Sequence, residues 1–186
     1  MKVFGFAGYS GSGKTTLIEQ VIAGLRQRGL RVSVIKHAHH GFDIDLEGKD
    51  TWRHRKAGAY EVLIASARRM ALMRENETER EPDVHALLAA LDAGVDWALI
   101  EGFKDADLPK IALWRAPQPG QAREPDAPYL QDTRVVAFVT DGTPLPVPTA
   151  LPVFDAGAPE TITRWMLAQG ARFDYHPHPR SPQTQP

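Results

Sequence analysis

The 186-residue sequence contains no cysteine. A disulfide framework, a thiolate metal site and a cysteine nucleophile are therefore excluded. The sequence also lacks an excess of one charge, because 22 lysines and arginines stand against 23 acidic residues and give a formal net charge of −1. A near-neutral protein has no electrostatic footprint for nucleic acid as its main partner. We therefore expect no nucleic-acid function.

Long hydrophobic runs are also missing. No stretch approaches the roughly 18 apolar residues that a membrane-spanning helix requires. The apolar run VFGFAG is too short for a signal peptide, and a glycine-rich loop follows it in place of a cleavage site. We therefore expect a cytoplasmic protein with no membrane partner. The length predicts a single domain over residues 1–175, and the composition of residues 176–186, HPHPRSPQTQP, predicts a disordered tail.

The first 36 residues alternate between strand and helix patterns. Residues 2–7 are typical of a buried strand, and residues 31–36 of a second one. Between them, residues 15–28 place apolar side chains three and four positions apart, as in an amphipathic helix, and Gly29 ends that pattern. A strand, a helix and a strand in this order form a βαβ unit, which predicts parallel strands.

The alternation continues along the chain. We expect further strands at 61–66, 69–73, 96–101, 110–114 and 135–139, and helices at 50–58, 83–91 and 159–169. The proline-rich segment 116–128 is expected to form a surface loop. The predicted fold class is α/β, with a mostly parallel central sheet flanked by helices in three layers, as in a P-loop NTPase.

The segment GYSGSGKTT, residues 8–16, matches the phosphate-loop pattern G-x-x-x-x-G-K-[ST] at every fixed position. It also stands between a predicted strand and a predicted helix, where that motif belongs. Its glycines allow positive φ and close approach of the backbone to a ligand. Successive N–H groups form an anion nest, and the following helix adds its positive dipole end. The loop is therefore predicted to bind the phosphates of a nucleoside triphosphate.

The side chains of this loop have separate expected roles. We expect Lys14 to reach the β- and γ-phosphates, the Thr15 hydroxyl to bind Mg²⁺, and Thr16 to touch the α-phosphate. The nucleotide-binding residues predicted within the loop are Gly8, Ser10, Gly11, Ser12, Gly13, Lys14, Thr15 and Thr16. A glycine turn without a ligand is the alternative, and the complete motif in its correct context argues against it.

A phosphate loop also needs an acid for its metal ion. Glu101 ends the apolar run WALIE just before Gly102. A carboxylate at the C-terminal end of a buried parallel strand faces the same crevice as the loop. We therefore expect Glu101 to bind Mg²⁺ directly or through water. The alternative is an acidic residue at the end of a strand with no role.

A polar loop, KHAHHGFDID at residues 36–45, opens at the same edge. We interpret it as a loop near the γ-phosphate. Asp43 or Asp45 is the candidate catalytic residue, which would position an attacking water, and Asp45 is also a candidate Mg²⁺ ligand. The histidines suggest zinc as one alternative, but their spacing is compressed and no cysteine assists. A solvated loop with no role is the other.

The base of the nucleotide requires a residue of its own. Asp141 follows the predicted strand VVAFV, which is where guanine-binding proteins place an aspartate that accepts hydrogen bonds from N1–H and N2–H. The Asn-Lys-x-Asp string of many such proteins is absent. The spacing alone therefore leaves GTP and ATP open, and an Asp-Gly turn without a role is the alternative for Asp141.

Several segments, in one order, resemble the MobB family of molybdopterin-guanine dinucleotide biosynthesis adaptor proteins. They are the glycine loop, KHAHHGFDIDLEGKD, RHRKAGA at 53–59, LIEGFK at 99–104 and PKI at 109–111. The resemblance extends over about residues 1–170, and the histidine-rich loop with EGFK is more specific than the glycine loop. It places His37, His39, His40, Asp43, Asp45, Asp50 and Arg53 in the family's signature loop.

The resemblance implies a GTP-binding homodimer that uses Mg²⁺ and hydrolyses GTP weakly. It also implies a partner, a MobA-like guanylyltransferase that joins GMP to molybdopterin, and possible contact with the molybdopterin itself. Slow hydrolysis is compatible with the sequence, because Arg53 is the best candidate for an arginine finger and is not clearly placed as one. The segment at 69–73 is a candidate dimer surface.

Two other functions fit the same motif. A small-molecule kinase would transfer the γ-phosphate to an acceptor, and the fold alone does not distinguish it from an adaptor. An interaction protein that no longer binds a nucleotide is disfavoured, because Lys14 and Thr15 are both present.

Overall fold

The structure of the protein is a computed structural model that describes residues 1–38, 41–115, 131–146 and 148–176. The chain divides into two compact units. The first comprises residues 1–37 with 83–186, and the second comprises residues 38–82. The predicted loop at 116–128 and the tail from residue 177 lie outside the described residues. That residues 1–175 form a single domain stays a prediction.

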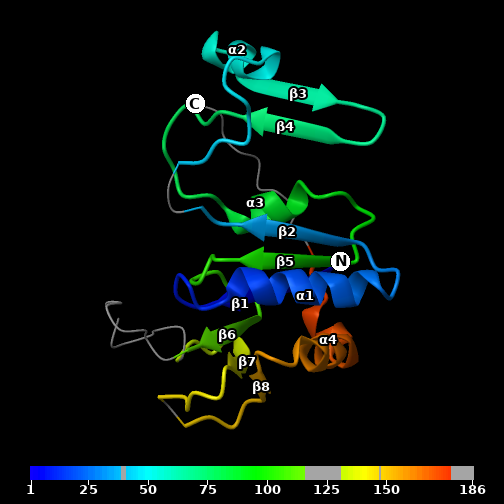
Figure 1. The fold of residues 1–186 in the computed structure, drawn as a ribbon, viewed down its shortest axis with the longest axis vertical. Coiled ribbons are helices and arrows are strands. Elements are labelled where there is room, and N and C mark those ends of the chain that lie inside the picture. Colours follow the sequence, from blue (N-terminus) through cyan, green and yellow to red (C-terminus); the bar gives the residue numbers. More distant parts are fainter. Residues whose placement is uncertain (39–40, 116–130, 147, 177–186) are drawn as a thin grey trace. The chain divides into compact units, whose positions relative to one another are not determined.

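The first unit is built on a six-stranded sheet in the order β2-β5-β1-β6-β7-β8, in which all neighbouring strands are parallel (Figure 1). Its strands are β1 (Lys2–Ala7), β2 (Val32–Lys36), β5 (Trp97–Glu101), β6 (Lys110–Trp114), β7 (Val135–Thr140) and β8 (Val153–Asp155). The inner strands are buried on both faces, which explains their continuous apolar runs. The sequence did not predict β8, because three partly exposed residues give no recognisable pattern.

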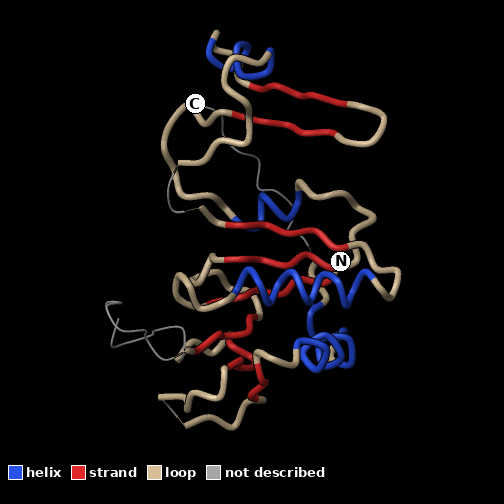
Figure 2. Tube along the Cα trace, in the orientation of Figure 1, coloured by secondary structure: helices blue, strands red, loops and turns tan. Residues whose placement is uncertain are grey.

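Helices cover both faces of this sheet (Figure 2). On one face lie α1 (Lys14–Arg26), α4 (Pro159–Ala168) and the 3₁₀ helix η2 (Gly170–Phe173), which pack around the fully buried Phe4. On the other face lies α3 (Val84–Ala89), whose Leu88 packs with Ile100. The Asp83 carboxylate accepts a hydrogen bond from the His85 N–H at 2.9 Å and so caps the N-terminus of α3. The three-layer α/β prediction is thereby confirmed.

A buried ion pair joins the start of β6 to the segment before β7. Lys110 is 2% exposed, and its Nζ donates to the Asp132 carboxylate at 3.1 Å and to the Lys104 and Ala106 carbonyls. Burial lowers the pKa of Lys110. Burial also acts to raise the pKa of Asp132, but hydrogen bonds from Arg134 and Lys110 outweigh it and lower that pKa to about 2.

The second unit contains α2 (Asp50–Lys56) and an antiparallel hairpin of β3 (Glu61–Ala65) and β4 (Met70–Arg74). The two strands predicted at 61–66 and 69–73 are confirmed, with their ends shifted by about one residue. Register pairs Leu63 with Leu72 and Ala65 with Met70, so these side chains share one face of the hairpin. None of the helices in the described part of the chain is long and apolar enough to cross a bilayer.

Candidate functional site

The phosphate loop connects the C-terminal end of β1 to α1. Its glycines Gly8, Gly11 and Gly13 have φ values of 154°, 77° and 91°, which are conformations that favour glycine. A Cβ atom on Gly8 would lie 2.8 Å from the Ser12 Oγ and 3.0 Å from the Leu113 carbonyl oxygen. Gly13 stands at the N-terminus of α1 in the left-handed conformation. The loop therefore has the backbone that a phosphate nest requires.

Ser12 places a buried hydroxyl inside this loop. The residue is 7% exposed, and its Oγ has no hydrogen-bond partner among the residues that the structure describes. An unpaired buried hydroxyl costs roughly 1–3 kcal/mol. A phosphate oxygen in the loop would accept its hydrogen bond, so Ser12 fits an anionic ligand. The remaining predicted contacts, Ser10, Gly11 and Thr16, are exposed at the loop.

Lys14 folds back over the loop that precedes it. Its Nζ donates to the Gly8 carbonyl at 2.8 Å and also to the Tyr9 carbonyl. Burial lowers the pKa of Lys14, the charge of Glu101 opposes that shift, and the charge of Lys36 adds to it. The ammonium group thus lies at the phosphate loop within the electrostatic influence of Glu101.

Thr15, Glu101 and Lys36 meet beside the phosphate loop. The Thr15 hydroxyl donates to the Glu101 Oε1 at 2.8 Å, and the Lys36 Nζ lies 3.4 Å from the same oxygen. Glu101 is 7% exposed. The three side chains come from α1, β5 and β2, whose ends the parallel sheet brings to one edge. A hydroxyl and a carboxylate at this distance are suitable oxygen ligands for Mg²⁺.

The turn after Glu101 packs tightly against His37. Gly102 has a φ of 88° and Phe103 a φ of 47°, and a Cβ on Gly102 would lie 2.9 Å from the His37 Cβ. The His37 and Phe103 rings stack with their centroids 4.6 Å apart. The His37 N–H also donates to the Glu101 carbonyl at 2.9 Å. These contacts hold His37 and the turn at Gly102 and Phe103 against each other beside the Glu101 carboxylate.

Asp141 lies where β7 ends, on the same edge of the sheet as the phosphate loop. The Thr143 hydroxyl and N–H donate to its Oδ1 at 2.6 and 3.3 Å. The Arg115 Nε lies 3.4 Å from its Oδ2. The hydrogen bonds from Thr143 and the charge of Arg115 lower the pKa of Asp141 in spite of partial burial. The carboxylate is therefore an ionised acceptor at neutral pH.

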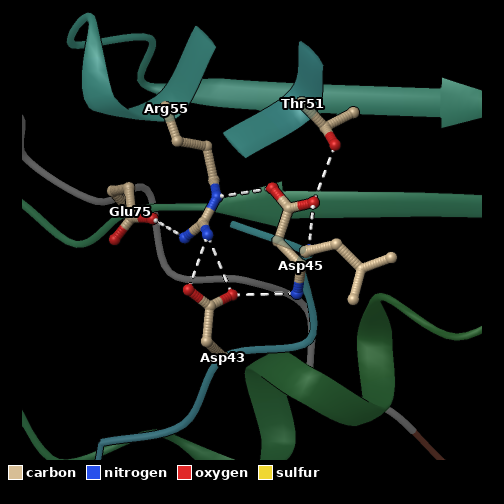
Figure 3. Close-up of polar contacts among 6 residues, drawn as sticks. Asp43, Asp45, Thr51, Arg55 and Glu75 are labelled. Atoms are coloured by element: carbon tan, nitrogen blue, oxygen red, sulfur yellow. Dashed lines mark hydrogen bonds and ion pairs between the residues drawn. The ribbon is translucent and has the colours of Figure 1, made fainter. Parts of the chain in front are cut away.

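Asp43 and Asp45 belong to the second unit, where both bind Arg55 (Figure 3). The Arg55 Nη2 donates to both Asp43 oxygens at 2.8 Å, and its Nε donates to Asp45 at 3.2 Å. The Thr51 hydroxyl donates to the other Asp45 oxygen at 2.7 Å, and the Arg55 Nη1 donates to Glu75 at 2.8 Å. The Arg55 side chain is only 13% exposed. One guanidinium therefore joins the loop, α2 and the segment after β4.

These contacts account for the charge state of both aspartates. The hydrogen bond from Arg55 is the main cause that lowers the pKa of Asp43, and the hydrogen bond from Thr51 has that role for Asp45. The carboxylates also raise the pKa of Arg55. The catalytic assignments of Asp43 and Asp45 and the Mg²⁺ assignment of Asp45 stay predictions. In the structure both residues bind a cation of the protein itself.

The described residues form no cluster of three or more histidine, cysteine or acidic side chains suited to a metal ion. His39 and His40 lie outside the described residues, so the structure does not test the zinc alternative. The sequence did not indicate Lys36, Arg55 or Arg115 as candidate site residues. Lys36 and Arg115 each stand at the end of a sheet strand, and a charged residue at that position was the signal that could have found them. Arg55 gave no such signal, because its partners lie 10, 12 and 20 residues away in separate segments and no local pattern links them to it.

Comparisons with known proteins identify the family of this chain. The chain matches the family described as molybdopterin guanine dinucleotide synthesis protein B, MobB, over residues 3–141. The molybdopterin-guanine dinucleotide biosynthesis adapter protein of Escherichia coli K12 is 40% identical over 167 residues, which cover 88% of this chain and 93% of that protein. A protein of the same description from Haemophilus influenzae is 46% identical over 114 residues, 61% of this chain and 63% of that protein.

Solved structures give the same result. MobB of Bacillus subtilis has a TM-score of 0.70 and 27% identity, and the match covers 91% of this chain and 98% of that one. The MobB homologue of Bacillus stearothermophilus has a TM-score of 0.67 and 27% identity, over 92% of this chain and 99% of that one. The family match contains the phosphate loop, Glu101 and Asp141. The chain belongs to the MobB family.

Proposed function

We propose that this chain binds GTP with Mg²⁺ at the phosphate loop and serves as an adaptor for a MobA-like guanylyltransferase in the formation of molybdopterin guanine dinucleotide. The observation that carries the nucleotide site is the grouping of the buried Ser12 hydroxyl, the Lys14 ammonium and the Thr15–Glu101 pair at one loop. The adaptor role is supported by the relatives, which are described as adapter proteins of this biosynthesis.

In this proposal different residues bind the phosphates, the metal ion and the base. The loop N–H groups, the Ser12 hydroxyl and Lys14 bind the phosphates, while Thr15 and Glu101 hold the metal. The bound Mg²⁺ neutralises charge on the phosphate oxygens. Lys36, 3.4 Å from Glu101, balances that carboxylate when the nucleotide is absent. Asp141 accepts from the guanine N1–H and N2–H, and its ionised state suits that role.

Weak hydrolysis is part of this proposal. The cations that lie beside Glu101 in the described structure are Lys14 and Lys36, whereas Arg115, which lies against Gly13, is paired with Asp141. A lysine lacks the planar fork of an arginine finger, which contributes about 10³–10⁵ in rate. Arg53, the candidate finger, is exposed in the second unit, with its Nη1 4.0 Å from Asp50. Slow turnover suits a protein that presents or retains GTP more than one that consumes it.

We further propose a homodimer formed through the β3–β4 hairpin. Leu63 is 58%, Met70 67% and Leu72 47% exposed, on one face of the hairpin. An isolated two-stranded hairpin is marginal in water, and such an exposed apolar face marks an interface. A second copy of the chain is the occupant that the resemblance implies. We expect Leu72→Glu to convert the dimer into a monomer in light-scattering chromatography, while Leu87→Glu, an exposed residue on α3, leaves it dimeric. A dimeric Leu72→Glu variant would contradict this surface.

Equilibrium binding tests the nucleotide site. We expect Lys14→Ala to lose GTP affinity by at least about a hundredfold, because it removes a charged donor to two phosphates. Circular dichroism should show an unchanged fold. A guanylyltransferase assay with each form then tests the adaptor role, and wild type but not Lys14→Ala should increase formation of the dinucleotide. Equal GTP affinity in the two forms would refute the site, and γ-phosphate transfer to a small acceptor would favour a kinase.

A further inference from the structure

Arg115 stands between the two halves of the proposed nucleotide site. It directly follows β6, which lies between β1 and β7 in the sheet. The phosphate loop follows β1, and Asp141 follows β7. Because register pairs Trp114 with Thr140, the next residues, Arg115 and Asp141, leave the sheet side by side. The strand order thus places the charged side chain of Arg115 between the phosphate loop and the proposed base site at Asp141.

Two contacts fix the guanidinium of Arg115 on that path. A Cβ atom placed on Gly13 would lie 3.5 Å from the guanidinium carbon, so the group lies against the bare Cα at the start of α1. Its Nε lies 3.4 Å from the Asp141 Oδ2. Both side chains remain partly open to solvent, at 43% and 39% exposure. One side chain therefore contacts the phosphate loop and the base-reading carboxylate together.

Asp141 keeps hydrogen-bond acceptor positions for a base in spite of its contacts with Thr143 and Arg115. A carboxylate has about four acceptor positions. Thr143 uses two of them on Oδ1, at 2.6 and 3.3 Å. The Arg115 contact of 3.4 Å to Oδ2 is an ion pair longer than an ordinary hydrogen bond. Oδ2 therefore retains acceptor capacity for guanine, while the opposing charges keep the carboxylate oriented.

We propose that Arg115 is the positioning residue for base selection: its guanidinium lies along the phosphate and ribose portion of the nucleotide and holds Asp141 toward the guanine edge. The inference rests on the proposed function, GTP binding at the phosphate loop. Adenine presents an acceptor at N1, which an ionised carboxylate repels. Loss of Arg115 therefore affects GTP more than ATP, because only the guanine complex depends on the orientation of Asp141.

The test is equilibrium binding of GTP and ATP, each with Mg²⁺, to the full-length wild type, Arg115→Gln and Arg115→Lys. We expect Arg115→Gln to lose about tenfold in GTP affinity and much less in ATP affinity. Arg115→Lys should retain more of the preference, because it keeps the charge. Arg28→Gln is the matched control, since it removes the same charge just beyond the C-terminal end of α1, away from the phosphate loop. A structural role alone would not change the ratio of the two affinities.

The outcomes separate this inference from the function on which it rests. A wild type that prefers GTP together with an Arg115→Gln variant of unchanged preference refutes the role of Arg115 alone. Equal losses for GTP and ATP also refute it, because they assign Arg115 to the phosphates only. A wild type that binds neither nucleotide, or binds both equally, refutes the proposed function itself.

Discussion

The substitution Glu101→Gln isolates the metal side of the proposed site. It removes one charge and keeps nearly the same shape, and the amide oxygen can still accept from the Thr15 hydroxyl, now 2.8 Å from Oε1. Glu101 is 7% exposed and stands near two ammonium groups, those of Lys36 and Lys14. The substitution therefore changes electrostatics and metal affinity more than packing.

The expected magnitude follows from these contacts. Loss of a carboxylate that orients a metal ligand costs about 10–100-fold in metal affinity. We therefore expect the Mg²⁺ concentration needed for tight GTP binding to rise by about that factor. Without Mg²⁺ the substitution should affect GTP affinity in the opposite direction, because the Glu101 carboxylate then repels the phosphates. In the presence of EDTA the variant should bind GTP at least as tightly as wild type.

Calorimetric titration of GTP over a series of Mg²⁺ concentrations measures both effects. Lys36→Gln is the matched control, since it removes the opposite charge next to the same carboxylate and should leave the Mg²⁺ requirement in place. A Glu101→Gln variant with the Mg²⁺ dependence of wild type would refute the assignment. Weaker GTP binding in EDTA would refute the electrostatic reasoning.

Two further predictions concern the rest of the fold. The pKa of Asp132 is lowered to about 2 in the folded protein, so the stability it contributes is present above its unfolded pKa of about 3.9 and is lost as the pH falls toward 2, about 2–3 kcal/mol in all. Denaturant unfolding from pH 7 to 2 should show a shallower acid decline for Asp132→Asn, and an unchanged decline would contradict the lowered pKa of Asp132 in the folded protein. In the second unit, Arg55→Gln should increase hydrogen exchange in residues 43–51 and in the hairpin, because three carboxylates lose their common donor. Arg53→Gln, an exposed neighbour on α2, is its control, and equal exchange in the two variants would contradict the role of Arg55.

The conformation of the glycine loop and the position of Glu101 beside it could be predicted from sequence because their signals are local. A buried strand, a glycine loop and a helix within 28 residues specify both the conformation of the loop and its edge of the sheet. The same logic predicted Glu101, since a strand of five buried residues ends there. The contact of Glu101 with Thr15 follows from the parallel pairing of β1 and β5.

The parts that sequence reasoning missed depend on contacts between distant segments. The contacts of Asp43 and Asp45 with Arg55 are one example, because α2 returns Arg55 to these aspartates and no local pattern encodes that return. In the sequence Arg115 is a single charged residue after a strand. It comes to lie between the phosphate loop and Asp141 only because β6 lies between β1 and β7 in the sheet. β8 is too short to predict, and it forms because β7 offers a parallel edge to three residues.

The most direct test of the account is a crystal structure of the protein grown with a non-hydrolysable GTP analogue and Mg²⁺. We expect the β- and γ-phosphates within residues 8–16, Mg²⁺ on the Thr15 hydroxyl with Glu101 in direct or water-mediated contact, and the guanine edge on Asp141. Nucleotide bound elsewhere on the chain, or a metal ion on Asp45 with Glu101 still paired to Lys36, would contradict it.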